Sequence, residues 1–543
     1  MKKKISLVFI FTIIIVSNNV RAQQKPIKNN DNTVQIIDRM QSRVQFEVGF
    51  VPEQLELVKL DTSAVLLVYT LYDDQNVYIN KYDNNLNKIY NTSITIPDKS
   101  KILLIRSYKQ KVYLLLIDKY KGPNYLADYN FTDNYKMIEF NHELKNIVEV
   151  EGVFKKLRMV QDIIPCDAGV FMSTLECYRM VKMAARYTMN FCALGIPSIF
   201  GYTKFPYIPY LVNIDFKNKQ ASEQVFNYPV QAAILGVDLD EEKKELNLSV
   251  KNKITKNENN VFVANYKYDA NTNVIKINEN KVNLPLGNDF YSAQIKTINS
   301  EEKLVLGSFG IGTIELINGI RECRGLFLSK MVKDKCEFTT LLNMNDMDSY
   351  QKKNNQKKFR NTSGNDGNNR GLLFHNIIVQ ENQYIVITES YIKTIALSTG
   401  SAGPMSGYDG CEYDKLLVFG FSKKGVKLWE QSIDLPYYKS YYPNELIVRT
   451  EVIEGNIYFT LVQDNGSILF VKLNNDNTLL KSKGIENIEN VKNEKSKQGI
   501  YMNGGVLYGN NYLVYGWEDV KEIDKKKNSK TVIFINKIIA SPN

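Results

Sequence analysis

Histidine and cysteine are scarce in this chain. Its 543 residues include two histidines, His142 and His375, and six cysteines. A zinc site needs three or four converging ligands, and a Ser-His-Asp site needs a well-placed histidine. The HExxH, P-loop and GxSxG motifs are also missing. The sequence therefore predicts no metal site, no cofactor and no triad-type hydrolase.

Long apolar runs are missing as well, except near the start. Lysines at 2–4 precede an uncharged apolar run at 5–16, and Val20 and Ala22 occupy the −3 and −1 positions of a small-residue cleavage site. This pattern is typical of a secretory signal peptide. The run is too short to cross a bilayer core of about 30 Å. We expect an exported mature chain that starts at Gln23, without a transmembrane segment, in the periplasm, on the outer-membrane surface or outside the cell.

A strong excess of one charge is also lacking. The formal net charge is +10, and the signal peptide accounts for four of these charges, which leaves +6. Much of the remainder lies in Lys/Asn-rich segments such as 351–360 and 521–530. A solvated loop face explains such segments better than a nucleic-acid patch does, so we expect no nucleic-acid partner.

The six cysteines would follow the chain into an oxidising compartment, which permits disulfides. Cys177 and Cys192 form the most local possible pair. Six cysteines allow fifteen full pairings, so the connectivity stays open.

Short apolar strands and polar turns are abundant. An apolar run after a turn recurs at 64–71, 111–118, 169–176, 303–310, 383–390, 456–463 and 511–517, with a weaker member at 244–250. Hairpins with a polar turn recur at 77–94, 136–152, 210–226, 261–278, 325–342, 416–433 and 467–483, with a half hairpin at 531–537. The two elements alternate eight times, and a further strand usually precedes the first of them.

Four short strands per unit of roughly 45–80 residues fit a propeller blade better than a sandwich. Helical periodicity is nearly absent. We therefore predict an all-β chain that folds as a single β-propeller of about eight four-stranded blades, with seven as the alternative. The unassigned strand at 43–50 is expected to pair with the last hairpin and close the ring, which hides exposed edges.

The predicted organisation is a signal peptide at 1–22, a lead at 23–42 and a propeller at 43–543. Long loops are expected at 177–209, 343–370 and 391–413. The first and last of these follow the second strand of a blade, so blade geometry places them on one face. Long loops on a rigid scaffold commonly carry binding residues.

Two blades share a Glu-x-Tyr pattern where such a loop begins. The pairs are Glu176 with Tyr178 and Glu389 with Tyr391. Two carboxylates on one face suit a cation, an amine or a sugar, or act as an acid–base pair. The alternative is that each carboxylate forms an ordinary ion pair with a neighbouring basic residue.

The loops themselves add aromatic and acidic candidates. Tyr202 and Tyr207 lie in the first loop, where aromatic rings either stack on sugars and anchor partners or fold back as a satellite core. Asp409 lies in the last loop, whose spacing matches no EF-hand calcium loop.

The segments HNIIVQENQYIVITESY (375–391) and YDGCEYDKLLVFGFSKKGVKLWEQSI (408–433) combine a strand pair ending in E-x-Y, an insertion and an F-x-K-x-G-x-x-x-W hairpin. This combination resembles uncharacterised exported β-propeller-like repeat proteins of Bacteroidetes-type bacteria. The resemblance implies a propeller fold and a cell-envelope location, and no site residue.

The leading functional hypothesis is a non-enzymatic binding or assembly propeller that presents its long loops to an envelope protein or glycan. The alternative is a carbohydrate-active hydrolase or lyase that uses carboxylates on the long-loop face. Fold alone does not decide between them.

Overall fold

The computed structural model describes residues 35–541 with interruptions in the connections between strands. The gaps are 48–51, 61–63, 73, 98–99, 119–130, 177–207, 227–231, 254–258, 270–273, 285–288, 312–321, 334, 352–369, 401–402, 436–437, 441–445, 454, 463–467, 475, 482–493, 497–500, 509–510 and 523–528. The predicted signal peptide and the tyrosines Tyr178, Tyr202 and Tyr207 lie outside the described residues.

The all-β prediction is confirmed. The described residues form antiparallel sheets, and their only helical pieces are the 3-10 turn η1 (Met344–Asp346) and the four-residue helix α3 (Asp348–Gln351). Within these residues, no helix has the length and apolar character needed to cross a membrane.

The strands fall into two compact units. In the first unit, four strands pair in chain order: β2 (Pro52–Lys59), β3 (Ala64–Leu71), β4 (Asn76–Asp83) and β5 (Lys88–Thr95). A second sheet has the order β1 (Gln35–Glu47), β34 (Ser529–Ser541) and β33 (Asn511–Glu522), with β31 (Glu494–Ser496) and β32 (Tyr501–Tyr508) also pairing with β33.

The predicted pairing of the N-terminal strand with the last hairpin is confirmed. β1 runs antiparallel to β34, with Val44 opposite Ile533. The core of this unit lies between its sheets, where Leu67 and Tyr69 of β3 share a buried cluster with Leu513 and Ile535.

The second unit contains four sheets in chain order. The first is seven-stranded: β6 (Ser100–Tyr108), β7 (Lys111–Asp118), β8 (Phe131–Asn141), β9 (Val148–Cys166), β10 (Gly169–Glu176), β11 (Ile208–Asp215) and β12 (Gln220–Val225). Two four-stranded sheets follow: β13 (Ala232–Asp240), β14 (Glu245–Lys253), β15 (Asn259–Tyr268) and β16 (Val274–Lys281), then β17 (Asp289–Thr297), β18 (Glu302–Ile311), β19 (Glu322–Val332) and β20 (Lys335–Asn343).

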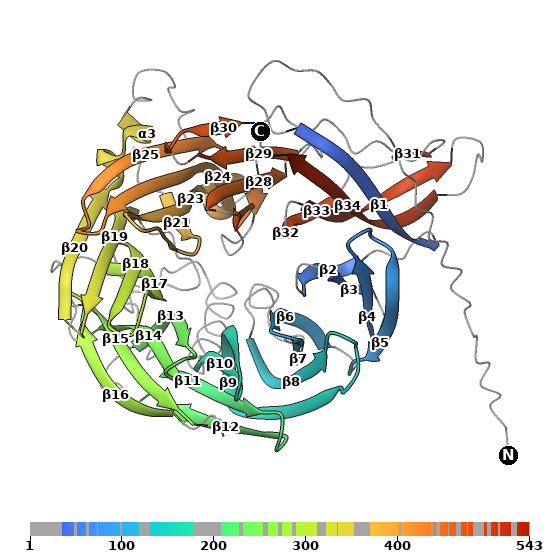
Figure 1. The fold of residues 1–543 in the computed structure, drawn as a ribbon, viewed down its shortest axis with the longest axis horizontal. Coiled ribbons are helices and arrows are strands. Elements are labelled where there is room, and N and C mark those ends of the chain that lie inside the picture. Colours follow the sequence, from blue (N-terminus) through green and yellow to red (C-terminus); the bar gives the residue numbers. More distant parts are fainter. Residues whose placement is uncertain are drawn as a thin grey trace. The chain divides into compact units, whose positions relative to one another are not determined.

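The fourth sheet of this unit has the order β21 (Arg370–Phe374), β23 (Gln383–Gly400), β24 (Gly403–Ser422) and β25 (Lys427–Asp434), with β22 (Ile378–Val379) on β23 and β26 (Lys439–Ser440) on β24. A further sheet follows in the chain: β27 (Val448–Ile453), β28 (Asn456–Val462), β29 (Ile468–Leu473) and β30 (Leu479–Lys481). Figure 1 shows these strands coloured in chain order.

Burial explains the apolar runs of the sequence. β3 and β10 are buried at every position, whereas the outer strands β5 and β12 are mostly exposed. A strand that is covered on both faces reads as a continuous apolar run, and each fully buried Leu or Val contributes about 1.5–3 kcal/mol. The second strand of each repeat therefore anchors its sheet in the core.

Two hairpins between third and fourth strands, β4–β5 and β8–β9, share one turn. Its fourth residue has positive φ, as at Leu86 and Leu144, and the side chain of its first residue accepts a backbone N–H, from Asn87 to Asp83 Oδ1 and from Lys145 to Asn141 Oδ1. A type I turn followed by a left-handed residue joins strands of this kind. The polar Asp/Asn turns of the sequence thus have a defined geometry.

Turns between first and second strands of successive repeats meet in the second unit. Lys109 pairs with Asp167 and lies 3.8 Å from Glu241, and Tyr108 donates to Asp167 at 3.2 Å. Three repeats thus place their first turns together at one end of their sheets.

Two predicted details differ from the structure. The segment 391–413, predicted as a long loop, continues the hairpin of β23 and β24, with Tyr391 opposite Tyr413 and Gly400 opposite Gly403. Its Thr- and Ile-containing stretch keeps β pairing because both sides of the ribbon supply ladder hydrogen bonds. In addition, β9 is both the fourth strand of one repeat and the first strand of the next, so the two repeats share the seven-stranded sheet.

Candidate functional site

Glu389 lies near the end of the four-stranded part of its sheet and is fully buried. Its Oε1 accepts the N–H of Val448 at 2.9 Å and lies 3.0 Å from Nε2 of His375. Its Oε2 accepts the N–H of Ile447 at 3.0 Å. Nδ1 of His375 lies 3.1 Å from Oγ1 of Thr450. The carboxylate is therefore tied into an internal chain of hydrogen bonds.

A carboxylate removed from water is tolerated only when hydrogen bonds replace its hydration. Here two backbone amides and an imidazole do so, and they come from segments that flank β23 on either side in the sequence. The role that this geometry gives Glu389 is to join the 446–450 segment to the sheet.

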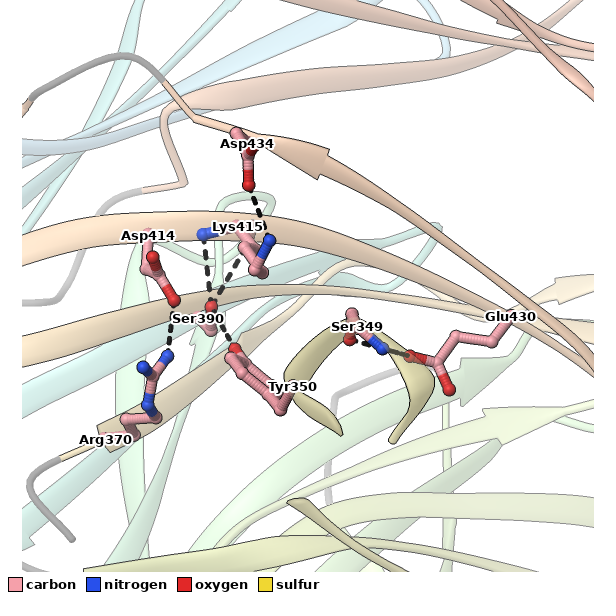
Figure 2. Close-up of polar contacts among 8 residues, drawn as sticks. All are labelled: Ser349, Tyr350, Arg370, Ser390, Asp414, Lys415, Glu430 and Asp434. Carbon is pink, nitrogen blue, oxygen red and sulfur yellow. Dashed lines mark hydrogen bonds and ion pairs between the residues drawn. The ribbon is translucent and has the colours of Figure 1, made fainter. Parts of the chain in front are cut away.

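The next residue, Ser390, continues the polar row (Figure 2). Its hydroxyl accepts a hydrogen bond from the Tyr350 hydroxyl at 2.7 Å and from the Lys415 N–H at 3.2 Å. The Lys415 ammonium, which is almost fully buried, pairs with Asp434 at 2.5 Å. Arg370 pairs with Asp414, and its guanidinium lies 4.4 Å from the Tyr350 ring centre.

These contacts dock α3 on the sheet. Glu430 of β25 accepts the N–H groups of Asp348 and Ser349 at 3.1 and 3.0 Å, and the Ser349 hydroxyl at 2.7 Å. Figure 2 shows Ser349 and Tyr350 turned toward opposite ends of this network. The polar residues at the base of the 391–413 ribbon thus hold α3 against the sheet, and the two together support the ribbon.

Tyr391 begins the ribbon beyond that support. Its ring lies over Gly371 on the neighbouring strand, where an added Cβ atom would lie 2.0 Å from the ring. The centres of the Tyr391 and Tyr413 rings are 6.3 Å apart. Burial raises the pKa of Tyr391 well above its usual value, so the phenol stays neutral. Asp409 belongs to β24, and its side chain lies outside the described set.

Glu176 ends β10 in the seven-stranded sheet and is buried. Its carboxylate pairs with Lys156 at 2.6 Å and accepts the Tyr210 hydroxyl at 2.7 Å. Burial alone would raise the pKa of Glu176, but the hydrogen bonds from Lys156 and Tyr210 outweigh it and hold the pKa below its ordinary value. Burial also raises the pKa of Tyr210, to about 12, with the bond to Glu176 adding to the effect.

A second ion pair adjoins Glu176. Arg158 of β9 donates from Nη2 to Glu223 at 2.7 Å and is stacked on the Tyr210 ring, with 3.6 Å from Cζ to the ring centre. The centre of the Phe154 ring lies 4.7 Å from the same Cζ atom. The carboxylates of Glu176 and Glu223 and the two cations Lys156 and Arg158 form one cluster near the end of β10.

Each of the two predicted carboxylates has its own set of partners. Glu176 and Glu389 belong to different sheets, and no interaction within the described part of the chain joins them. The same residues contain no group of three or more His, Cys, Asp or Glu side chains arranged to hold a metal ion.

Sequence reasoning missed the partners of these carboxylates. His375, Thr450, Lys156 and Arg158 were not candidates, because each is distant in sequence from the glutamate it serves. The signal that was available is the pair of polar runs Thr388–Glu389–Ser390 and Ser173–Thr174, which interrupt strands that are otherwise apolar and buried.

Comparison with known proteins identifies no family. No protein-family model and no curated protein matches the chain. Among solved structures, a prolyl oligopeptidase B from Galerina marginata matches at 10% identity with a TM-score of 0.37, over 87% of this chain and 56% of that one. A Synechocystis apocarotenoid oxygenase matches at 8% identity with a TM-score of 0.32, over 53% of this chain and 61% of that one.

A neuraminidase-like protein of a flat-faced bat isolate matches at 10% identity with a TM-score of 0.27, over 70% of this chain and 87% of that one. The chain thus spans little more than half of the first of these structures. Such weak similarities are between β-rich proteins and transfer no activity.

Proposed function

We propose that this protein is an exported binding or assembly protein of the cell envelope, without catalytic activity. Its sheets act as the blades of a single β-propeller of about eight blades, which β1 closes. The segments 177–209 and 391–413 meet a protein or glycan partner. The resemblance of 375–433 to exported repeat proteins of Bacteroidetes-type bacteria supports the location.

The observation that carries this proposal is the ribbon formed by 391–413, here called the arm. Beyond Ile392, which pairs with β21, and Cys411, which pairs with β26, β23 and β24 continue as a two-stranded ladder as far as Gly400 and Gly403. A two-stranded ribbon carries unpaired backbone groups along its outer edges, which suit pairing with a strand of a partner.

The base of the arm is rigid. Glu389, Ser390 and Lys415 are almost completely buried, and each is held by hydrogen bonds. Binding elements held on a rigid support lose less entropy on association. A support of this kind fits a projecting element that recognises a partner.

Acid–base chemistry fits the carboxylates poorly. A glycosidase acid needs a raised pKa so that it holds a proton near neutral pH. The pKa of Glu176 is instead lowered by its bonds to Lys156 and Tyr210. Glu389 has its oxygens occupied by two amides and His375. Both carboxylates are therefore better suited to joining segments of the fold than to transferring protons.

The test is photo-crosslinking in the native host. A crosslinking residue replaces Ser398 in the arm or, as the matched control, Glu143 in the exposed turn after β8, and captured molecules are identified by mass spectrometry. A third chain replaces 395–409 with Asn-Gly, which allows a two-residue hairpin turn between Thr394 and Gly410.

We expect repeated capture of the same few envelope components from position 398, and none of them from position 143. Shortening the arm should lower recovery of these partners on a tagged chain at least about tenfold, equivalent to about 1.4 kcal/mol. Equal capture from the two positions, or unchanged recovery with the shortened arm, would contradict the proposal.

A further inference from the structure

Thr450, His375 and Glu389 form a continuous chain of hydrogen bonds within the second unit. Oγ1 of Thr450 lies 3.1 Å from Nδ1 of His375, and Nε2 of the same ring lies 3.0 Å from Oε1 of Glu389. The three residues come from β27, from the connection after β21 and from β23. A hydroxyl, an imidazole and a carboxylate in this order and at these distances are the arrangement that activates a hydroxyl nucleophile.

The hydrogen bonds of Glu389 determine which nitrogen of the ring carries the proton. Its two oxygens accept the backbone N–H groups of Ile447 and Val448 and face the ring of His375. Three donors thus converge on a carboxylate, which offers only lone pairs. In the neutral ring the proton therefore lies on Nε2, and Nδ1 presents its lone pair to the hydroxyl of Thr450.

The ring of His375 is fixed in its orientation. The backbone N–H of His375 donates to the carbonyl of Ile387 at 3.0 Å. The carbonyl of the preceding residue, Phe374, accepts the side chain of Gln294 at 2.9 Å. A base held in this way is already aligned with the hydroxyl, so little reorganisation is needed when the hydroxyl reacts.

Exposure to solvent increases along the hydrogen-bonded chain. Glu389 is fully buried, His375 is 5% exposed, and Thr450 is partly exposed on β27. Compounds in solution therefore meet the hydroxyl residue first, whereas the base and the carboxylate behind it are covered. Burial of the imidazole also keeps water away from Nδ1, which favours reaction of the Thr450 hydroxyl over reaction of water.

Anchoring of the 446–450 segment does not require the contact of Thr450 with the imidazole. Glu389 already binds the backbone N–H groups of Ile447 and Val448, which ties the segment to the sheet. The bond between Thr450 and His375 adds a polarised hydroxyl to that anchor. A hydroxyl with a base at hydrogen-bond distance is prepared for attack on a carbonyl carbon.

We propose that Thr450 is a nucleophile that takes up an acyl group from an activated ester or thioester. Oγ1 of Thr450 forms a bond to the acyl carbon while its proton passes to Nδ1 of His375. The carbon–oxygen or carbon–sulfur bond of the donor then breaks, and Nδ1 returns the proton to the departing alcohol or thiol. The product is an O-acyl threonine, and no oxidation or reduction takes place. Glu389 stays ionised and stabilises the imidazolium between the two proton transfers.

This inference goes beyond the proposed binding function and is compatible with it. The acyl group stays on the chain, because the buried imidazole does not activate water for its removal. The protein is modified once and does not turn over.

The test treats the purified mature chain with p-nitrophenyl acetate. Release of p-nitrophenolate is followed by absorbance, the gain of acetyl groups by intact mass, and the acetylated residue by peptide mapping. Neutral hydroxylamine removes acetyl from a hydroxyl and leaves it on a lysine, so it separates Thr450 from acetylated lysines. We expect a burst that ends with a single hydroxylamine-sensitive acetyl group, on Thr450.

Thr450→Val keeps the shape of the side chain and removes the hydroxyl, so this acetyl group should be lost. Thr478→Val is the matched control, because Thr478 is exposed and its hydroxyl donates to Asp476 at 2.6 Å, a carboxylate without an imidazole. It should leave the burst unchanged. His375→Gln should slow acetylation of Thr450 about a hundredfold, as expected for loss of a general base.

The ring tautomer is measured on the natural chain and so does not depend on a variant that folds. Nitrogen-15 NMR should show the proton of the neutral His375 ring on Nε2 and none on Nδ1. A proton on Nδ1 would overturn the proposal, as would a natural chain in which Thr450 gains no acetyl group or gains it no faster than Thr478. Continued release of p-nitrophenolate after the burst would also overturn it, because the acyl group would then leave the chain.

Discussion

At the residue scale, the buried polar groups of this protein act as connectors between segments that are distant in sequence. Glu389 joins the 446–450 segment to β23, and Glu176 joins β9, β10 and β11 through Lys156 and Tyr210. Breaking one side of such a contact leaves a buried group unpaired, which costs more than the contact itself contributes. These residues therefore control stability at the bases of the two long segments.

Glu176 gives this role a pH dependence. Because its pKa is lower in the folded protein than the ordinary value of 4.5, its bonds add stability above about pH 4.5, and this stability is lost as the pH falls through the folded pKa. Glu176→Gln should cost about 1–3 kcal/mol at pH 7. The difference should shrink on acidification below pH 4.5 in urea unfolding experiments.

Glu143→Gln serves as the control, since Glu143 is 68% exposed and its pair with Lys145 lies in a turn. It should leave unfolding nearly unchanged at either pH. A constant difference between the natural chain and Glu176→Gln down to pH 2 would contradict the assigned role of the carboxylate.

Sequence analysis could locate the two candidate glutamates but not the residues that bind them. The Glu-x-Tyr pattern located Glu176 and Glu389, because strand ends that precede long connections are recognisable. Their partners were not located, because Lys156 reaches Glu176 from the neighbouring strand β9 and His375 reaches Glu389 from the connection between β21 and β22. Thr450 reads as an ordinary polar residue in a strand until its contact with His375 is known.

At the element scale, glycines of the sheets are paired with aromatic residues on the next strand. The cross-strand pairs are Gly152 with Tyr135, Gly307 with Phe327, Gly371 with Tyr391 and Gly420 with Trp429. At each of these glycines a Cβ atom would come within about 3 Å of the partner ring. The ring covers the backbone that the glycine leaves bare, an arrangement known to rescue strand glycines.

Gly420→Ala tests this pairing. The new Cβ would lie 2.1 Å from Nε1 of Trp429, whose N–H donates to Gln383 at 2.8 Å, so the ring must leave its site. We expect a loss of about 1–3 kcal/mol in the free energy of unfolding, as for other overpacked positions.

The partner variant shows whether the ring is the cause. In a Trp429→Ala background, Gly420→Ala should cost less than half as much, because the clash is gone. If the alanine costs the same with and without the indole ring, backbone conformation rather than packing requires the glycine.

Strand positions were the most predictable elements. The predicted runs 64–71, 111–118 and 169–176 coincide with β3, β7 and β10. Their apolar sequence and the turns before them are both local signals. The arm was predicted as a loop because its small and polar residues have weak strand propensity, and only pairing with the opposite side of the ribbon makes them strands.

At the scale of the whole molecule, the two ends of the chain share one sheet. β34 lies between β1 and β33, so its outer edge is covered by the strand at the other end of the chain. An uncovered strand of this length would be a site for association with other chains.

A chain that begins after Glu47 should therefore lose stability and self-associate. We expect a lower Tm by calorimetry and concentration-dependent oligomers by light scattering, whereas a chain that begins at Val34 should remain stable and should not associate. Hydrogen exchange at 532–537 should speed up only in the shorter chain. Unchanged exchange there would mean that β1 adds little to the sheet.

The nineteen residues of β9 have a further consequence for the repeat itself. In an array of separate repeats, each can be gained or lost in evolution, and each can open on its own. Because β9 completes one repeat and begins the next, these two repeats cannot open, or be gained or lost, separately. The segment from β6 to β12 must unfold, and must be inherited, as a double repeat.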